Sequence, residues 1–203
     1  MESFLSIEKN ATAETLIERS RFITHVFYAE TEEKSRGYLD KIKKEYSDAT
    51  HNCYAYVTDF GLSTKSSDDG EPSGTAGAPI MEVIKNKKLI NVLVVVTRYF
   101  GGIKLGAGGL IRAYSASAKE GILKAVEKEY FVCDIFKVKL KYDELNVFKK
   151  EILPVCFLTE DIVYDEGVTI TVAVKKSGYK PFIDKFKAVF YDKTPEKIGE
   201  EYY

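Results

Sequence analysis

The 203-residue sequence predicts an α+β protein of two domains, residues 1–131 and 132–203. Segments rich in β-branched and aromatic residues alternate with segments of helical apolar spacing. The length and the apolar fraction of 45% allow the chain to bury a core without a metal or a disulfide. From about Val132 the pattern changes to the order β-α-β-β-α-β, which marks the tail as a second domain.

The elements of the first domain begin with residues 13–30, whose composition is typical of one long strand or two shorter ones. Thr31 fits the N-cap of a helix that continues to about Tyr46. Residues 51–59 alternate between small and aromatic side chains, which predicts a strand with two different faces. The Ser-, Gly- and acid-rich stretch 60–78 is predicted to be a long loop that is either functional or mobile.

Two more helices and a strand complete this domain. Pro79 fits the start of a short helix that opens at the preceding glycines. Residues 91–97 are apolar without alternation, which predicts a strand covered on both faces. A glycine-rich connection leads to a helix over about 110–128, and its small residues allow close approach to the sheet.

The tail has the element order of a ferredoxin-like unit. Its predicted strands and helices cover residues 134–142 (strand), 143–153 (helix), 156–164 and 168–175 (strands), 179–191 (helix) and 196–203 (strand).

The composition limits the classes of partner and the location. The formal net charge of −1 gives no general attraction to nucleic acid or to anionic lipid. No stretch approaches the length of a membrane span, and the N-terminus lacks the pattern of a secretion signal, so a cytoplasmic location without membrane contact is expected. The three cysteines are far apart and include no C-x-x-C, which argues against a disulfide framework or a zinc site.

The most distinctive local feature is a cationic segment. Residues 83–119 hold seven basic residues and no acid, a local charge of +7, so the rest of the chain carries −8. Within it, a strand, a glycine loop and a helix start follow one another, as in sites that bind phosphate through backbone amides. We expect a site for the phosphate backbone of RNA here, formed by Arg98, Tyr99, Gly101, Gly102, Lys104, Gly106, Gly108, Gly109 and Arg112. The alternatives are a solvated basic face and glycines needed only for positive φ and tight packing.

A second glycine cluster follows three acids and forms a secondary loop. Its residues are Asp68, Asp69, Glu71, Gly74, Thr75 and Gly77. The acids either hold Mg²⁺ against a phosphate or form ion pairs with Arg98 and Arg112. Ion pairs are favoured because carboxylates lie near arginines far more often than they bind metals, so no cofactor is expected.

Residues 51–59 suggest two further roles. Tyr54 and Tyr56 share a strand face, where they either stack on RNA bases or pack under other parts of the chain. His51 and Cys53 share the opposite face, but a buried cysteine beside a hydrogen-bonded histidine is commoner than a catalytic pair. No hydrolase signature is present, and no catalytic residue is predicted.

The sequence resembles the YigZ/IMPACT family, and in particular the bacterial branch whose members have two domains. The resemblance is carried by the motifs Asp68–Pro79 and Val94–Ser115, by HNCYAYV from His51 and by ERSRFITHV from Glu18. The resemblance implies a first domain like the second domain of a small-subunit ribosomal protein. It also implies a second domain like the last domain of elongation factor G. Eukaryotic members are regulators of translation that act through protein contacts. No catalytic residues transfer from the family.

The sequence and the resemblance together favour a non-enzymatic protein that binds RNA, the ribosome or a translation factor. A Mg-dependent enzyme acting on a nucleotide or phosphometabolite and a protein-interaction module are the alternatives. The oligomeric state is left open.

Overall fold

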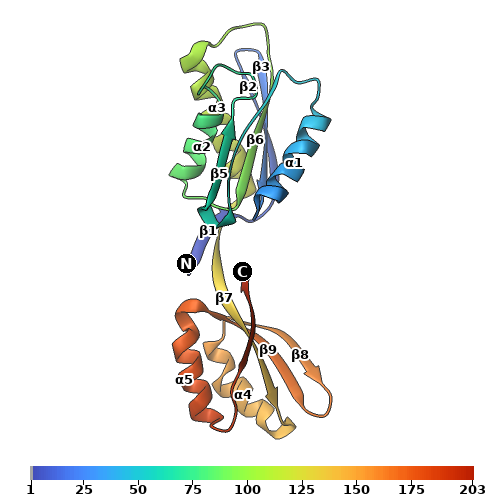
Figure 1. Cartoon of the computed structure of the whole chain (residues 1–203), viewed down its shortest axis with the longest axis vertical. Helices are drawn as coiled ribbons and strands as arrows, with labels where there is room; N and C mark the ends of the chain where they lie inside the picture. Colours follow the sequence, from blue (N-terminus) through green and yellow to red (C-terminus); the bar gives the residue numbers. More distant parts are fainter. Residues whose placement is uncertain (1) are drawn as a thin grey trace. The chain divides into compact units, whose positions relative to one another are not determined.

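The computed structural model describes residues 2–203, which divide into two compact units. Leu5–Glu129 form the N-terminal unit, and Tyr130–Tyr203 form the C-terminal unit together with the residues up to Phe4 (Figure 1). The sequence expectation placed residues 1–131 together. Residues 2–4 group with the C-terminal unit instead, because β1 (Ser3–Ile7) lies beside β7 (Glu127–Leu140) in one sheet.

The N-terminal unit is built on a five-stranded antiparallel sheet with the order β2-β3-β6-β4-β5. Its central strand, β6, is buried from Val92 to Arg98, as expected for a strand covered on both faces. The strands are β2 (Ala11–Ile17), β3 (Ser20–Tyr28), β4 (His51–Thr58), β5 (Ser63–Ser67) and β6 (Val92–Tyr99).

Helices cover both faces of this sheet. Apolar residues of α2 (Gly77–Asn86) and α3 (Gly106–Ala125) form one core with Cys53, Ala55 and Val57 of β4. Side chains of α1 (Glu32–Glu45) form a second core on the other face. The alternation of β4 is thus confirmed, and each of its faces is covered.

Local sequence explains how these helices begin and pack. Thr31 caps α1 as predicted: its side chain accepts a hydrogen bond from the Lys34 N–H at 3.2 Å. The small residues of α3 permit close approach, because an added Cβ at Gly121 would lie 2.4 Å from Thr24 Cγ2. The predicted start of α3 was wrong by four residues, since the helix already includes the glycines from Gly106.

The C-terminal unit has the predicted order β-α-β-β-α-β. Side chains of both helices pack with β7 and β9 in one apolar core, so the helices share one face of the sheet. The strand order is β1-β7-β9-β8, with β10 also paired to β7. The elements after β7 are α4 (Leu145–Glu151), β8 (Leu158–Tyr164), β9 (Val168–Lys175), α5 (Tyr179–Val189) and β10 (Glu196–Tyr202).

Two strands were missed by the sequence analysis. β1 begins the chain, and β5 lies within the stretch assigned to a loop. Short 3-10 turns occur at Asp59–Gly61, Tyr142–Glu144, Leu153–Val155 and Lys176–Gly178. Among the described residues, no helix has the length and apolar character needed to cross a membrane.

Candidate functional site

The acidic loop between β5 and α2 is organised around the carboxylate of Asp68. Its oxygens accept hydrogen bonds from the backbone N–H groups of Gly74 at 2.8 Å, Ala76 at 3.0 Å and Gly77 at 2.8 Å. Ala76 and Gly77 lie at the start of α2, where backbone amides have no partner within the helix. The second glycine cluster is therefore a closed turn that holds the chain's own carboxylate. Thr75 is buried in the same turn and donates to the Pro72 carbonyl at 2.7 Å.

The charge of Asp68 should contribute to stability in a pH-dependent way. Partial burial opposes its ionisation, but the three N–H groups outweigh burial and hold the pKa of Asp68 below its usual value. Asp68→Asn is expected to cost about 1 kcal/mol at neutral pH, because the neutral side chain is a weaker acceptor. A depressed folded-state pKa means that this contribution is present above the unfolded pKa of about 4 and is lost as the pH falls through the folded value.

Urea denaturation of wild type and Asp68→Asn across the acidic range measures this contribution. The difference in unfolding free energy should shrink as the pH falls below about 4. A difference that stays constant down to the lowest measurable pH would contradict the role given to the Asp68 charge.

Asp69 links the same loop to α1, which covers the face of the sheet opposite to α2 and α3, and to β4. Its Oδ1 lies 2.7 Å from Lys43 Nζ of α1, and its Oδ2 accepts the Asn52 N–H at 2.7 Å. Partial burial opposes its ionisation, but Lys43 and the Asn52 amide outweigh burial, so the pKa of Asp69 is lowered. Asp69 therefore serves the fold of the loop.

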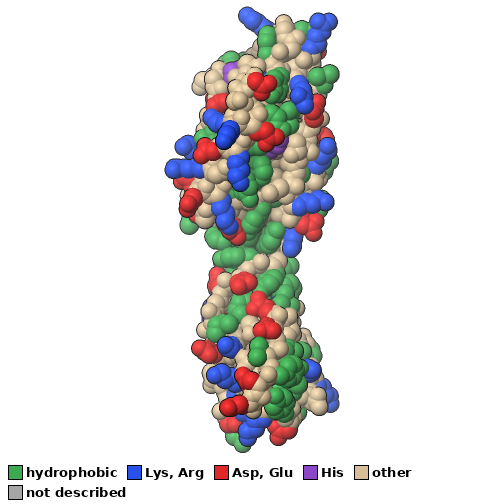
Figure 2. All heavy atoms as spheres, turned by 90° about the vertical axis from the view of Figure 1, so that its right-hand side faces the viewer, with side chains coloured by type: hydrophobic (Ala, Val, Ile, Leu, Met, Phe, Trp, Pro, Cys, Tyr) green, Lys and Arg blue, Asp and Glu red, His purple; other side chains and the backbone are tan. Residues whose placement is uncertain are grey.

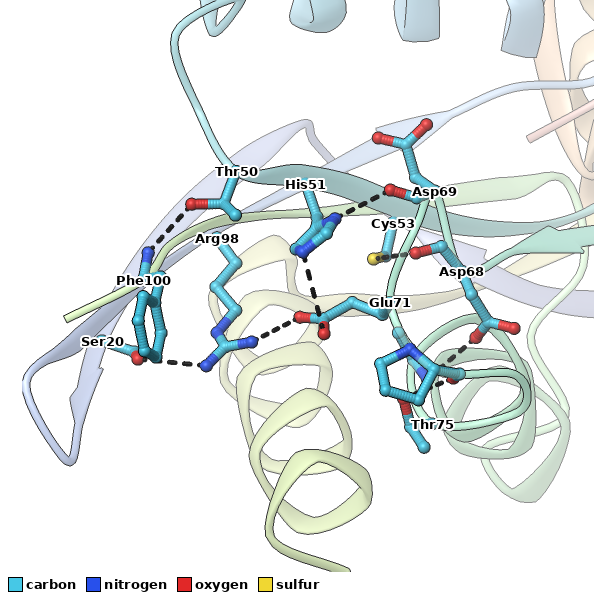
Figure 3. Close-up of polar contacts among 12 residues, drawn as sticks. Ser20, Thr50, His51, Cys53, Asp68, Asp69, Glu71, Thr75, Arg98 and Phe100 are labelled. Atoms are coloured by element: carbon cyan, nitrogen blue, oxygen red, sulfur yellow. Dashed lines mark hydrogen bonds and ion pairs between the residues drawn. The ribbon is translucent and has the colours of Figure 1, made fainter. Parts of the chain in front are cut away.

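Glu71 and Arg98 form a buried ion pair at the centre of the site (Figure 3). Arg98 Nη1 lies 2.6 Å from Glu71 Oε1, and their side chains are only 6% and 4% exposed. Tyr114 of α3 donates its hydroxyl to the same oxygen at 2.8 Å, and Arg98 Nη2 donates to Ser20 Oγ at 3.3 Å. The ion pair expected between the acidic loop and Arg98 is present.

The burial of Arg98 corrects its predicted role. The residue is 5% exposed and Glu71 neutralises its charge, so it is not available to an RNA backbone that runs over the surface. The count of charges along the segment could not show this, because the neutralising carboxylate lies outside the segment. Burial of both partners makes the pair a structural element of the unit.

His51 and Cys53 point toward the acidic loop from β4 (Figure 3). A backbone carbonyl only accepts, so His51 Nδ1 carries a proton and donates to Asp69 O at 2.9 Å. His51 Nε2 lies 3.8 Å from Glu71 Oε2. Cys53 Sγ donates to Asp68 O at 2.9 Å, and burial raises the pKa of this thiol to about 12. Cys53 is therefore a thiol at neutral pH and is not poised as a nucleophile.

Tyr54 and Tyr56 do not form an open stacking platform. They are 8% and 2% exposed and belong to the core formed with Ile42 of α1 and its neighbours. The prediction that they could stack on RNA bases is wrong, because helices cover both faces of the sheet. The alternative that they pack under other parts of the chain is the one observed.

The first glycine segment combines a tight contact with an exposed loop. An added Cβ at Gly101 would lie 1.9 Å from Arg19 O, so the backbone of the turn that leads into β3 excludes a side chain there. Gly102 and Gly106 have φ of +87° and +68° and are exposed, as are Lys104 and Gly108. Gly109 is half-buried. Tyr99, the last residue of β6, donates its hydroxyl to Asp48 Oδ1 at 2.8 Å. Close packing therefore requires a glycine at Gly101, whereas Gly102, Gly106 and Gly108 are exposed to solvent.

The exposed part of this segment leads into the N-terminus of α3, which is 20 residues long. Its first turn has no acidic residue, and its N-cap residue, Leu105, makes no side-chain capping hydrogen bond. Two pockets lie along this turn and share Lys104 and Leu105. The larger, of about 520 Å³, also contains Arg112, and the smaller, of about 250 Å³, reaches Glu71 and Arg98.

Cationic side chains are fewer at this site than the sequence count indicates. Of the segment 83–119, Lys87 pairs with Glu127 and Arg98 with Glu71. Among the described residues, neither Lys104 nor Arg112 has an ion pair in the structure, and both are exposed. Figure 2 shows one face of the molecule, where Lys and Arg are interspersed with Asp and Glu. At the start of α3, Lys104 and Arg112 are therefore the cations available to an anion.

Comparison with known proteins assigns the family. The model of the Impact N-terminal domain matches residues 18–122. "IMPACT family member YvyE" of Bacillus subtilis is 39% identical over 201 residues, which cover 98% of this chain and 93% of that relative. The chain belongs to the IMPACT family.

Two further likenesses agree with this assignment. "IMPACT family member YigZ" of Escherichia coli is 32% identical over 149 residues, covering 72% of this chain and 73% of the relative. A crystal structure of "an hypothetical protein" superposes with a TM-score of 0.66 at 27% identity and covers 98% of each chain. The match to the Impact N-terminal domain, residues 18–122, extends over the site described above.

The sequence analysis did not predict two residues that contact the Glu71–Arg98 ion pair, Tyr114 and Ser20. The contact of the Tyr114 hydroxyl with Glu71 was not predicted. Ser20 contacts both Arg98 and the Gly101 N–H, at 3.3 Å each. A buried tyrosine usually finds a hydrogen-bond partner, so Tyr114 carried a usable signal, whereas Ser20 had none.

Proposed function

We propose that this IMPACT-family chain associates with RNA, on the ribosome or with a translation factor, and takes part in the regulation of translation. The observation that carries the proposal is the uncapped, acid-free N-terminus of α3 beside two exposed cations, Lys104 and Arg112, that form no ion pair with any described residue. The family resemblance supplies the link to translation. No turnover is part of the proposal.

The start of α3 offers three sources of attraction for a phosphate. The helix dipole places about half a positive charge at this end, and the first backbone N–H groups have no partner within the helix. Arg112 lies further along the helix, where its Nη1 would be 3.5 Å from a Cβ added at Gly108. The guanidinium thus lies close to the first turn, and Lys104 precedes it. Together they form a site for one or two phosphates of an RNA backbone.

The two units support the finer fold assignment that we propose. The order β10-β7-β9-β8 and the helices on one face fit a ferredoxin-like domain resembling the last domain of elongation factor G. The N-terminal unit would correspond to the second domain of a small-subunit ribosomal protein. Both relatives work on RNA. We place the boundary between the two domains near residue 131, close to where the two compact units meet in the sequence, and take the cytoplasm as the location.

The Mg-dependent alternative receives no support from the acidic loop. Asp68 is held by backbone amides, Asp69 by Lys43 and Glu71 by Arg98. Among the described residues, no group of three or more metal-ligating side chains is placed to bind a metal ion. The donors that a bridging Mg²⁺ would require are therefore engaged within the protein.

RNA affinity of a charge-reduced variant tests the proposal. Lys104→Ala/Arg112→Ala should weaken binding of a short labelled mixed-sequence RNA by about tenfold or more at low salt, measured by fluorescence anisotropy. The matched control is Lys41→Ala/Lys44→Ala, which removes the same charge from α1 on the opposite face of the sheet. Equal loss in both double variants would show only a general charge effect and would contradict the site.

A further inference from the structure

The smaller pocket beside the start of α3 has apolar walls and a polar floor. Pro72, Phe100, Leu105 and Leu110 contribute the walls, and the Glu71–Arg98 pair lies at the bottom. Phe100 is 46% exposed although it is a large aromatic side chain. An exposed ring at the edge of an apolar pocket is a surface on which a planar group can stack.

One of the residues that line this pocket, Arg98, has a polar atom that the protein does not satisfy. Arg98 uses Nη1 for Glu71 and Nη2 for Ser20, but its buried Nε has no hydrogen-bond partner within the part of the chain that the structure describes. Its guanidinium lies 5.5 Å from the centre of the Phe100 ring. The pocket thus combines an aromatic edge, a guanidinium and a carboxylate, the groups that recognise the polar edge of a base.

The neighbouring pocket could bind the second part of the same ligand. It shares Lys104 and Leu105 with the smaller pocket and adds Arg112. Two cations, Lys104 and Arg112, and one carboxylate, Glu18, line the neighbouring pocket, so its charged lining is positive on balance. An apolar pocket next to such a lining fits a molecule with a planar apolar part linked to a phosphate. With a volume of about 250 Å³, the smaller pocket is below the usual range for whole ligands and suits a single ring system.

We propose that the smaller pocket receives one unstacked base of a single-stranded RNA whose phosphate lies at Lys104 and the first turn of α3. This inference rests on the proposed function, because it requires the phosphate site. An aliphatic side chain of a protein partner would fill the walls but would make no use of Lys104 and Arg112 beside them, so a nucleotide, which carries a base and a phosphate together, is favoured. Several bases can stack in this way, and the proposal does not require one sequence.

A variant that fills the pocket without changing charge tests the proposal. Ala107 is exposed, is the second residue of α3 and lines the smaller pocket. Ala107→Phe should weaken RNA binding by about tenfold, roughly the contribution of one stacked base. The matched control is Ala78→Phe, at the exposed second residue of α2, which should bind RNA like wild type.

An abasic oligomer with the same number of phosphates separates this inference from the proposed function. Wild type should bind the mixed-sequence RNA about tenfold more tightly than the abasic oligomer, and Ala107→Phe should bind both alike. If both oligomers bind wild type equally and Ala107→Phe has no effect, the base pocket is wrong while the phosphate site stands. If neither oligomer binds, the proposed function fails as well. The assignment would also be overturned if Ala107→Phe abolished binding to a protein partner and left the affinity for RNA unchanged.

Discussion

Arg98→Ala is expected to destabilise the N-terminal unit by about 3–5 kcal/mol, because it leaves the Glu71 carboxylate buried without its cation. Glu71 is 4% exposed on its side chain, and the Tyr114 hydroxyl alone cannot replace an ion pair. Native-state hydrogen exchange of the β4 and β6 amides reports the stability of this unit separately from the other. The free energy of opening that hydrogen exchange reports for these amides should fall by about 3–5 kcal/mol.

Two further variants make this result interpretable. Arg21→Ala removes a cation from an ion pair of 2.9 Å with Glu14 whose side chains are 48% and 54% exposed, and it should leave protection close to that of wild type. Arg98→Met/Glu71→Leu removes both buried charges and should restore most of the lost stability. If Arg98→Ala alone has no more effect than Arg21→Ala, the pair does not hold the site together.

Gly101→Ala is expected to cost about 3 kcal/mol or more, because its Cβ would overlap backbone atoms. The added carbon would lie 1.9 Å from Arg19 O and 2.6 Å from Ser20 N. No side-chain rotation relieves an overlap with main-chain atoms, so β3 or the loop must move. Urea or thermal unfolding of the N-terminal unit measures the loss.

Gly102→Ala provides the comparison at the next residue. Nothing lies within 4 Å of its added Cβ among the described residues, but the φ of +87° disfavours a side chain. We expect a loss of about 1–2 kcal/mol from the backbone alone. Similar losses at both positions would show that close approach to β3 is not what requires glycine at Gly101.

The elements with local signals were predicted well. Thr31 followed by two acids marks the start of α1, and the unbroken apolar run marks β6 as the centre of its sheet. β5 was missed because its sequence, STKSS, is polar and it is an edge strand that covers no core. The start of α3 was missed because glycine has low helix propensity, and here tertiary packing overrides that preference.

The candidate site was predicted less well, because its contacts join distant parts of the chain. Alternation separated Tyr54 from Cys53 correctly, but a period of two does not say which faces helices will cover. Charge counting placed Arg98 in a cationic segment, whereas the fold brings Glu71 against it. Lys104 and Arg112 stay exposed at the start of α3, and no sequence rule separates them from Arg98.

The central claim is that phosphate binds where α3 begins, and the salt dependence of RNA affinity tests it most directly. Plots of log affinity against log salt concentration should be shallower for Lys104→Ala/Arg112→Ala than for wild type. On single-stranded RNA, the slope should change by about 0.7 for each phosphate that the variant no longer neutralises. Parallel plots for wild type and the variant would contradict the claim.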